Sequence, residues 1–179
     1  MEDDIIDSLY GAIRTVPDFP IEGIMFRDIT PVLADGGLLT SLVDRMVTDM
    51  HALGWRPTHI AGPESRGFIF GSMVADRLGA GFVPVRKPGK LPYQVASAEY
   101  ALEYGTNTLE IHTDAIKQGD RVVIVDDLLA TGGTVAATVG LCRSLGASVE
   151  GAMFLIELEG LGGSAKIGVD SHSLLTFPA

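Results

Sequence analysis

Two adjacent carboxylates, Asp126 and Asp127, follow a run of β-branched apolar residues and precede a short segment of small and hydroxyl-bearing residues. That segment consists of Ala130, Thr131, Gly132, Gly133 and Thr134. Glycines let the backbone approach a ligand closely, and amides at the N-terminus of a following helix favour an anion. The acids can face hydroxyl groups or a metal ion. We therefore expect a ligand that has both a phosphate group and free hydroxyl groups, such as a phosphorylated sugar.

This segment differs from the common nucleoside-triphosphate loop, in which a lysine precedes the final serine or threonine. No lysine occurs between Lys117 and Lys166. A buried strand that ends in a glycine-rich turn would explain residues 122–125, but it would leave the paired acids and the Thr-Gly-Gly-Thr sequence unexplained. The pattern therefore favours a sugar phosphate over a nucleoside triphosphate.

Cations that could bind a second anionic group occur at two other places. Arg66 lies in a turn after a short predicted strand, and Arg86, Lys87 and Lys90 follow the next predicted strand. In a chain with a formal charge of −10, three cations within five residues suggest more than a solvated surface. We predict that these four residues bind pyrophosphate. A surface salt bridge for Arg66, and a solvated face for each lysine, are the alternative interpretations.

The composition of the 179 residues limits the class of protein. An apolar content of 46% fits one folded domain over residues 1–179. The negative charge argues against a nucleic-acid partner. The single cysteine, Cys142, excludes an internal disulfide, and the four histidines lack metal-ligand spacing. Without a membrane-length apolar run or a secretory leader, we expect a cytoplasmic protein with no membrane partner.

Hydrophobic spacing predicts an α/β domain in which strands and helices alternate. The helices are expected at residues 5–13, 39–53, 68–78 and 135–145, and the strands at residues 59–62, 81–85, 122–125, 149–158 and 173–177. Three prolines predict irregular structure over residues 16–31, and recurring turn residues predict a mobile two-stranded hairpin over residues 91–112. The alternation predicts a mainly parallel, open sheet flanked by helices, with its site at the carboxyl ends of the strands.

A second glycine-rich segment, residues 160–165, fits the dinucleotide pattern G-x-G-x-x-A. Too little chain follows it to form a strand–helix–strand unit, and no acid lies about 20 residues further on. We therefore interpret this segment as a turn.

Five segments resemble, in the same order, the adenine-specific branch of the type I phosphoribosyltransferase family. They are residues 26–31, 64–68, 86–92, 100–105 and 125–134. The resemblance implies the type I phosphoribosyltransferase fold, with a small hood at residues 1–35 and a mobile catalytic loop at residues 86–112. It also implies a homodimer that uses Mg²⁺ to convert adenine and phosphoribosyl pyrophosphate (PRPP) to AMP and pyrophosphate, which is purine salvage.

The same resemblance implies roles for individual residues. Residues 130–134 would hold the 5-phosphate, and Asp126 and Asp127 would face the ribose hydroxyls. Mg²⁺ would be held mainly by the donor, near these two acids. Glu103 would act as the acid–base residue on the purine imidazole ring, together with Arg66 at the pyrophosphate. A solvated loop charge is the alternative interpretation of Glu103.

The base would be held by Phe26, Arg27 and Leu158. In the family, the aromatic ring stacks on adenine and the backbone of the next residue faces its Watson–Crick edge. Backbone groups are rigid enough to distinguish a 6-amino from a 6-oxo purine. Leu158 would close the opposite face, and ordinary core packing is the alternative interpretation of Phe26.

Two other functions stay open at this stage. A transferase for a 6-oxopurine or orotate would leave residues 26–31 and Glu103 without a role. A PRPP-sensing regulator would need a nucleic-acid-binding module or a basic face, and the charge of this chain is acidic.

Overall fold

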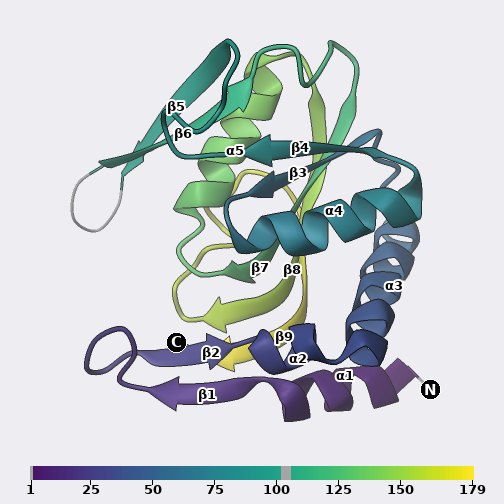
Figure 1. Cartoon of the computed structure of the whole chain (residues 1–179), viewed down its shortest axis with the longest axis vertical. Coiled ribbons are helices and arrows are strands. Elements are labelled where there is room, and N and C mark those ends of the chain that lie inside the picture. The colour runs from purple at the N-terminus through teal and green to yellow at the C-terminus, as the bar shows by residue number, and fades with distance from the viewer. Residues whose placement is uncertain (1, 102–105) are drawn as a thin grey trace.

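The computed structural model describes residues 2–101 and 106–179. Its centre is a parallel five-stranded sheet in the order β4–β3–β7–β8–β9. These strands are β3 (His59–Pro63), β4 (Gly81–Val85), β7 (Arg121–Leu129), β8 (Ser148–Glu159) and β9 (Ser171–Pro178). Their arrowheads point to the same side of the molecule (Figure 1). The predicted parallel sheet and its five strands are therefore confirmed.

Strand β7 is the middle strand, and it is longer than the sequence pattern indicated. Asp126 pairs with Phe154, and Leu129 pairs with Glu157, in the register with β8. The two acids therefore lie inside the last part of the strand and not beyond its end. The partner strand explains the difference, because β8 continues to Glu159 and supplies ladder partners past residue 125.

Both faces of the sheet are covered by helices. Val123 and Val125 belong to the core shared with α1 (Glu2–Ala12), α3 (Gly36–Ala52) and α4 (Arg66–Leu78). Val122 and Ile124 belong to the opposite core, beneath α5 (Gly133–Ser144). All four side chains are fully buried, which explains why this strand is an unbroken apolar run.

The hood is more regular than the prolines suggested. Strands β1 (Arg14–Pro17) and β2 (Met25–Asp28) pair antiparallel, and α2 (Thr30–Ala34) follows. Pro17 is the last residue of β1, and Pro31 lies in the first turn of α2, where a missing amide hydrogen does no harm. The prediction of irregular structure over residues 16–31 was therefore wrong outside the connecting loop. The hood forms the lowest layer in Figure 1, beside β9.

The predicted hairpin is present as β5 (Val95–Ala101) and β6 (Thr106–His112), which pair antiparallel. Reciprocal backbone hydrogen bonds between Arg86 and Glu110 attach it to the segment after β4. Glu103 lies outside the described residues. Figure 1 shows the hairpin and the loop of the hood on the side to which the sheet strands point.

Two further expectations are confirmed. Cys142 is fully buried on α5, and burial raises the pKa of its thiol to about 12, so it behaves as a small apolar side chain. Residues 160–165 form neither helix nor strand and connect β8 to β9 as a turn. No helix within the described ranges, 2–101 and 106–179, has the length and hydrophobicity needed to cross a membrane.

Candidate active site

A cavity of about 410 Å³ lies at the carboxyl ends of β3 and β7. Four parts of the chain line it: residues 64–66 between β3 and the start of α4, Lys87 after β4, Tyr100 of β5, and residues 126–135. The structure therefore brings together the paired acids, residues 130–134, Arg66 and Lys87. Lys87 is one member of the basic cluster, which consists of Arg86, Lys87 and Lys90. These parts were predicted from segments that are far apart in the sequence, from Arg66 to Thr134.

Residues 130–134, called the phosphate loop below, end at the N-terminus of α5. Gly132 is the N-cap residue of that helix and has a φ of 82°, a conformation that residues with a side chain rarely adopt. Because Gly132 has no side chain to cap the helix, the amide groups of the first turn are left for another acceptor. The helix dipole also favours negative charge at this point, so the loop can bind a phosphate.

The two acids lie at the base of the cavity in different surroundings. Asp127 is only 4% exposed, and its Oδ2 lies 2.6 Å from Nε of Arg66. Asp126 accepts a 2.9 Å hydrogen bond from the amide of Asp127 through Oδ1. Burial, followed by the nearby charge of Asp127, raises the pKa of Asp126 well above its ordinary value. Burial also raises the pKa of Asp127, although Arg66 opposes this. A bound cation would therefore favour the charged forms of both acids.

The basic cluster divides into two parts. Lys87 lines the cavity, whereas Nε of Arg86 lies 2.9 Å from Oε2 of Glu64 and its Nη1 donates to the carbonyl of Lys90 at 3.3 Å. The side chain of Lys90 is exposed and is not among the cavity residues. Arg86 thus fastens the segment after β4 to the turn after β3. Direct pyrophosphate contacts by Arg86 and Lys90 remain predictions.

Tyr100 was missed as a site residue by the sequence analysis. It lines the cavity from β5, and its hydroxyl lies 3.3 Å from Oγ1 of Thr134. Ala96, Ala98 and Tyr100 pack on the core beneath α5, so this strand alternates with period two. That alternation is the signal that could have identified the tyrosine.

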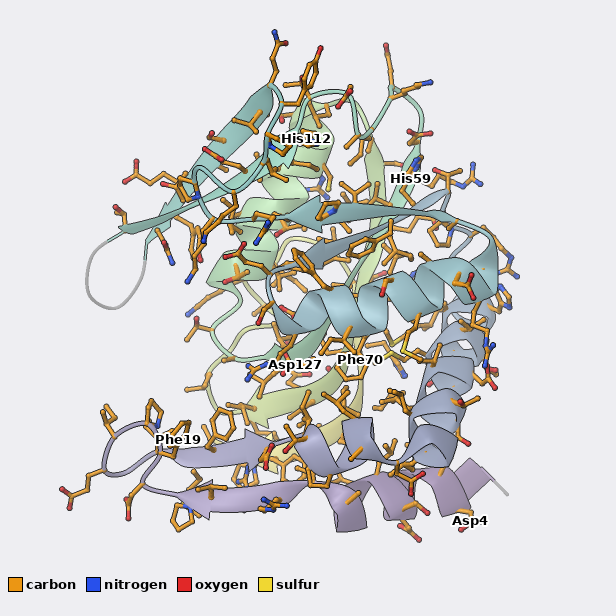
Figure 2. The ribbon with its side chains drawn as sticks, in the orientation of Figure 1. Asp4, Phe19, His59, Phe70, His112 and Asp127 are labelled. Carbon is orange, nitrogen blue, oxygen red and sulfur yellow. The ribbon has the colours of Figure 1, made fainter. Side chains whose placement is uncertain are left out.

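Phe26, one of the three predicted base-binding residues, lies beside Arg66 of this cavity. The ring centroid of Phe26 is 5.8 Å from Cζ of Arg66, and the ring of Phe19 meets it edge-on at 5.1 Å. Leu158 is partly buried near the end of β8 and pairs with Phe177 of β9. Figure 2 shows Phe19 on the hood and Asp127 at the sheet above it. Phe26, on strand β2 of the hood, therefore lies next to Arg66, which lines the cavity.

The side chain of Arg27 points away from the cavity and toward β9. Its Nη1 donates to Oγ1 of Thr15 at 2.6 Å, and its Nη2 donates to the carbonyl of Pro178 at 3.1 Å. Its guanidinium carbon also lies 4.7 Å from the ring centroid of Phe177. These contacts tie the hood to the last strand of the sheet.

Comparison with known proteins agrees with this geometry. Residues 33–165 match the model of the phosphoribosyl transferase domain. An adenine phosphoribosyltransferase from Francisella tularensis subsp. novicida is 53% identical over 173 residues, which cover 96% of this chain and 99% of that protein. The chain belongs to the adenine phosphoribosyltransferase family. The family was predicted from its five segments, and this prediction is confirmed.

Solved structures of adenine phosphoribosyltransferases confirm the type I fold. The enzyme from Thermoanaerobacter pseudethanolicus has a TM-score of 0.93 and 51% identity, with 96% of this chain and 99% of that chain covered. The Saccharomyces cerevisiae enzyme, complexed with an imino-altritol bisphosphate and adenine, has a TM-score of 0.93 and 40% identity, with 97% and 99% covered. The similarity therefore extends over the sheet, the hood and the hairpin.

Proposed function

We propose that the protein transfers the 5-phosphoribosyl group of PRPP to N9 of adenine and releases AMP and pyrophosphate, a purine salvage reaction. The observation that carries this proposal is the single cavity that joins a phosphate loop, two acids and Arg66, with Phe26 beside it. The relatives named adenine phosphoribosyltransferase support the choice of reaction. The presence of adenine in the yeast structure supports the choice of base.

The donor would be bound along the floor of the cavity. The backbone amides of residues 130–134, with the hydroxyls of Thr131 and Thr134, would hold the 5-phosphate. Asp126 and Asp127 would accept hydrogen bonds from the ribose hydroxyls. Arg66 and Lys87 would neutralise the pyrophosphate, which gains negative charge as its bond to C1 breaks. Positioning and electrostatics would supply most of the rate enhancement.

The residues present fit Mg²⁺ as a cofactor. Mg²⁺ is commonly held by one or two carboxylates together with substrate oxygens. Asp126 and Asp127 are two such carboxylates that line the cavity, and burial raises the pKa of both, so a bound cation would stabilise their charged forms. Within residues 2–101 and 106–179, no group of three or more ligating side chains forms a cage by itself. A metal bound mainly by the donor would neutralise the charge of the leaving pyrophosphate.

The base would lie against Phe26, because stacking on an aromatic ring is favourable. Backbone N–H and C=O groups of Arg27 would read the 6-amino edge, and Leu158 would cover the second face. The side chain of Arg27 is engaged with β9, which fixes the backbone at this position. A rigid donor and acceptor would disfavour a 6-oxo purine, because its polar groups would be left unpaired.

Glu103 would remove or hold the proton that leaves the imidazole ring of adenine as the new bond forms at N9. Closure of the catalytic loop, residues 86–112, would exclude water and desolvate this carboxylate, which would raise its pKa toward that of a useful base. Water exclusion would also protect PRPP from hydrolysis. The hairpin within this segment contacts the phosphate loop through Tyr100, whose hydroxyl lies 3.3 Å from Oγ1 of Thr134.

We also infer a cytoplasmic homodimer that binds neither nucleic acid nor membranes. Four apolar side chains are exposed in the loop between β1 and β2 and at the first residue of β2, namely those of Phe19, Ile21, Ile24 and Met25. Exposed apolar clusters of this kind commonly mark contact surfaces, and a second copy of the chain would cover them. Light scattering of the purified protein at micromolar concentration tests this, and a monomeric mass would contradict it.

The activity is tested by incubating the protein with Mg²⁺, PRPP and one base at a time. We expect AMP with adenine, and at least ~100-fold lower kcat/KM with hypoxanthine, guanine or orotate. Product with hypoxanthine but not adenine would favour the 6-oxopurine alternative. PRPP binding without turnover of any base would favour the regulator.

A further inference from the structure

The turn between β8 and β9 packs directly on the phosphate loop. A Cβ atom added at Gly163 would lie 2.2 Å from the carbonyl oxygen of Ala130. A Cβ atom added at Gly132 would lie 2.7 Å from the carbonyl oxygen of Gly163. Ordinary van der Waals contacts begin at about 3.4 Å, so neither glycine leaves room for a side chain. The two backbones touch at the point where the loop turns into α5.

This turn is itself held in place. Ile167 is only 2% exposed and packs in the core beneath α5. The amide of Lys166 donates to the carbonyl of Gly163 at 3.0 Å, and Nη2 of Arg143 on α5 donates to the carbonyl of Gly168 at 3.1 Å. The turn is thus fastened to the same helix whose N-terminus receives the phosphate. It is a fixed surface against which the phosphate loop rests.

We propose that Gly163 is a positioning residue for the 5-phosphate of the donor, and this inference rests on the function proposed above. Its missing side chain sets how far the loop lies from the turn, and hence where the amides of residues 130–134 point. A displacement of about 1 Å in a binding group can cost on the order of 100-fold in rate. The glycine-rich segment 160–165 therefore serves the phosphate site by close packing and not by binding a dinucleotide.

The decisive variant is Gly163→Ala. Gly163 does not have a positive φ, so the cost of alanine comes from its new contacts: the Cβ atom would clash with the carbonyl group of Ala130 and would lie 3.1 Å from Cδ1 of Leu129. The matched control is Gly140→Ala on the exposed face of α5, where an added Cβ would meet nothing within 4 Å. Both variants should fold, which a thermal melt will verify, and only the first should change the loop.

We expect Gly163→Ala to raise the KM for PRPP at least ~10-fold and the KM for adenine less than ~2-fold. Inhibition by ribose 5-phosphate should weaken by a similar factor. Inhibition by pyrophosphate should not change, because Arg66 and Lys87 belong to other parts of the chain, at the start of α4 and after β4. An unchanged KM for PRPP in the folded variant, or an equal rise in both KM values, would overturn the proposal.

If Gly163→Ala does not fold, Arg143→Met replaces it as the test. Loss of the bond to Gly168 should loosen the turn and raise the KM for PRPP about 2- to 3-fold, and an unchanged value would overturn the proposal. Should the wild-type protein form no AMP, the proposed function fails separately. Calorimetry with ribose 5-phosphate then decides the role of the glycine, because weaker binding by the alanine variant supports it and equal binding overturns it.

Discussion

The donor end and the base end of this site are built in opposite ways. At the donor end, Asp127 is 4% exposed in the middle strand of a five-stranded sheet, and the phosphate loop is fixed between that strand, α5 and the following turn. At the base end, Phe26 belongs to the two-stranded sheet β1–β2, and the side chain of Arg27 ties that sheet to β9. The geometry of the donor end is therefore fixed by backbone structure, whereas that of the base end depends on the contacts of a few side chains.

The chemistry of the two ligands accounts for this difference. A charged donor is stabilised by dipoles and charges that are already oriented before it binds, and such orientation requires a rigid frame. A purine needs mainly a flat apolar surface, which tolerates small displacements. Substitutions at the two ends should therefore affect the two substrates separately, and the donor end should show the larger effects.

The largest effect is expected for Asp127→Asn. It removes a buried charge that, in the proposed function, would face the ribose, and it frees Arg66, whose Nε lies 2.6 Å from the carboxylate. We expect kcat/KM for PRPP to fall about 100-fold, while adenine binding to the free protein changes little. Asp44→Asn is the control, because Asp44 forms an exposed pair with Arg77 at 2.7 Å. A similar loss of kcat/KM for PRPP in Asp127→Asn and Asp44→Asn would show that the loss is not specific to the donor end.

A smaller effect, confined to the base, is expected for Phe26→Ala. Loss of a stacked ring costs about 1–3 kcal/mol per base, so the KM for adenine should rise about 10-fold and that for PRPP less than ~2-fold. Phe19→Ala is the comparison, because this ring touches Phe26 edge-on and is 51% exposed. It should have a weaker effect of the same kind. Unchanged adenine kinetics in the Phe26 variant would count against stacking.

A still smaller effect should follow from loosening the hood as a whole. Arg27→Lys keeps the positive charge but cannot reach both Thr15 and the carbonyl of Pro178. We expect the KM for adenine to rise about 3-fold with an unchanged KM for PRPP. Arg14→Lys in the same small sheet is the control, since Arg14 is largely exposed and forms only a 3.5 Å pair with Asp28. A larger change for PRPP than for adenine would contradict the assigned role of the hood.

The same contrast explains how much the sequence could reveal. The donor end was predictable because its signals are local: an unbroken apolar run, two acids and a glycine-rich segment follow one another, and β7, the phosphate loop and α5 appear in that order. Arg66 could also be placed, because the carboxyl ends of parallel strands meet at one edge of the sheet.

The missed features depend on contacts between distant segments. Tyr100 meets Thr134 across 34 residues, and Arg27 meets Pro178 across 151 residues. No local pattern encodes such pairs. The pairing of β1 with β2 was not predicted, because prolines are typical of irregular structure, whereas Pro17 here is the last residue of its strand. The packing of Gly163 on Ala130 was likewise invisible until both turns were seen together.

The smallest effect that separates the two ends concerns the stability of the ligand-free protein. The pKa of Asp126 is raised well above its ordinary value of 3.8, chiefly by burial. The folded protein therefore keeps this proton to a higher pH than the unfolded chain does. Unfolding then releases a proton, so the free energy of unfolding falls as the pH rises from about 4 through the raised pKa, and is constant above it.

Asp126→Asn removes this titration while its Oδ1 can still accept the hydrogen bond from the amide of Asp127. At pH 7 we expect the Tm of the ligand-free variant to exceed that of the wild type by a few degrees. In a protein of this size, each kcal/mol gained in the free energy of unfolding raises the Tm by about 2–4 °C. The gap should close as the pH falls toward 4. Thermal melts between pH 4 and pH 8 measure this, and parallel curves for the two proteins would contradict it. A variant that is more stable but binds PRPP more weakly would show that the donor end retains a destabilising charge because the ligand requires it.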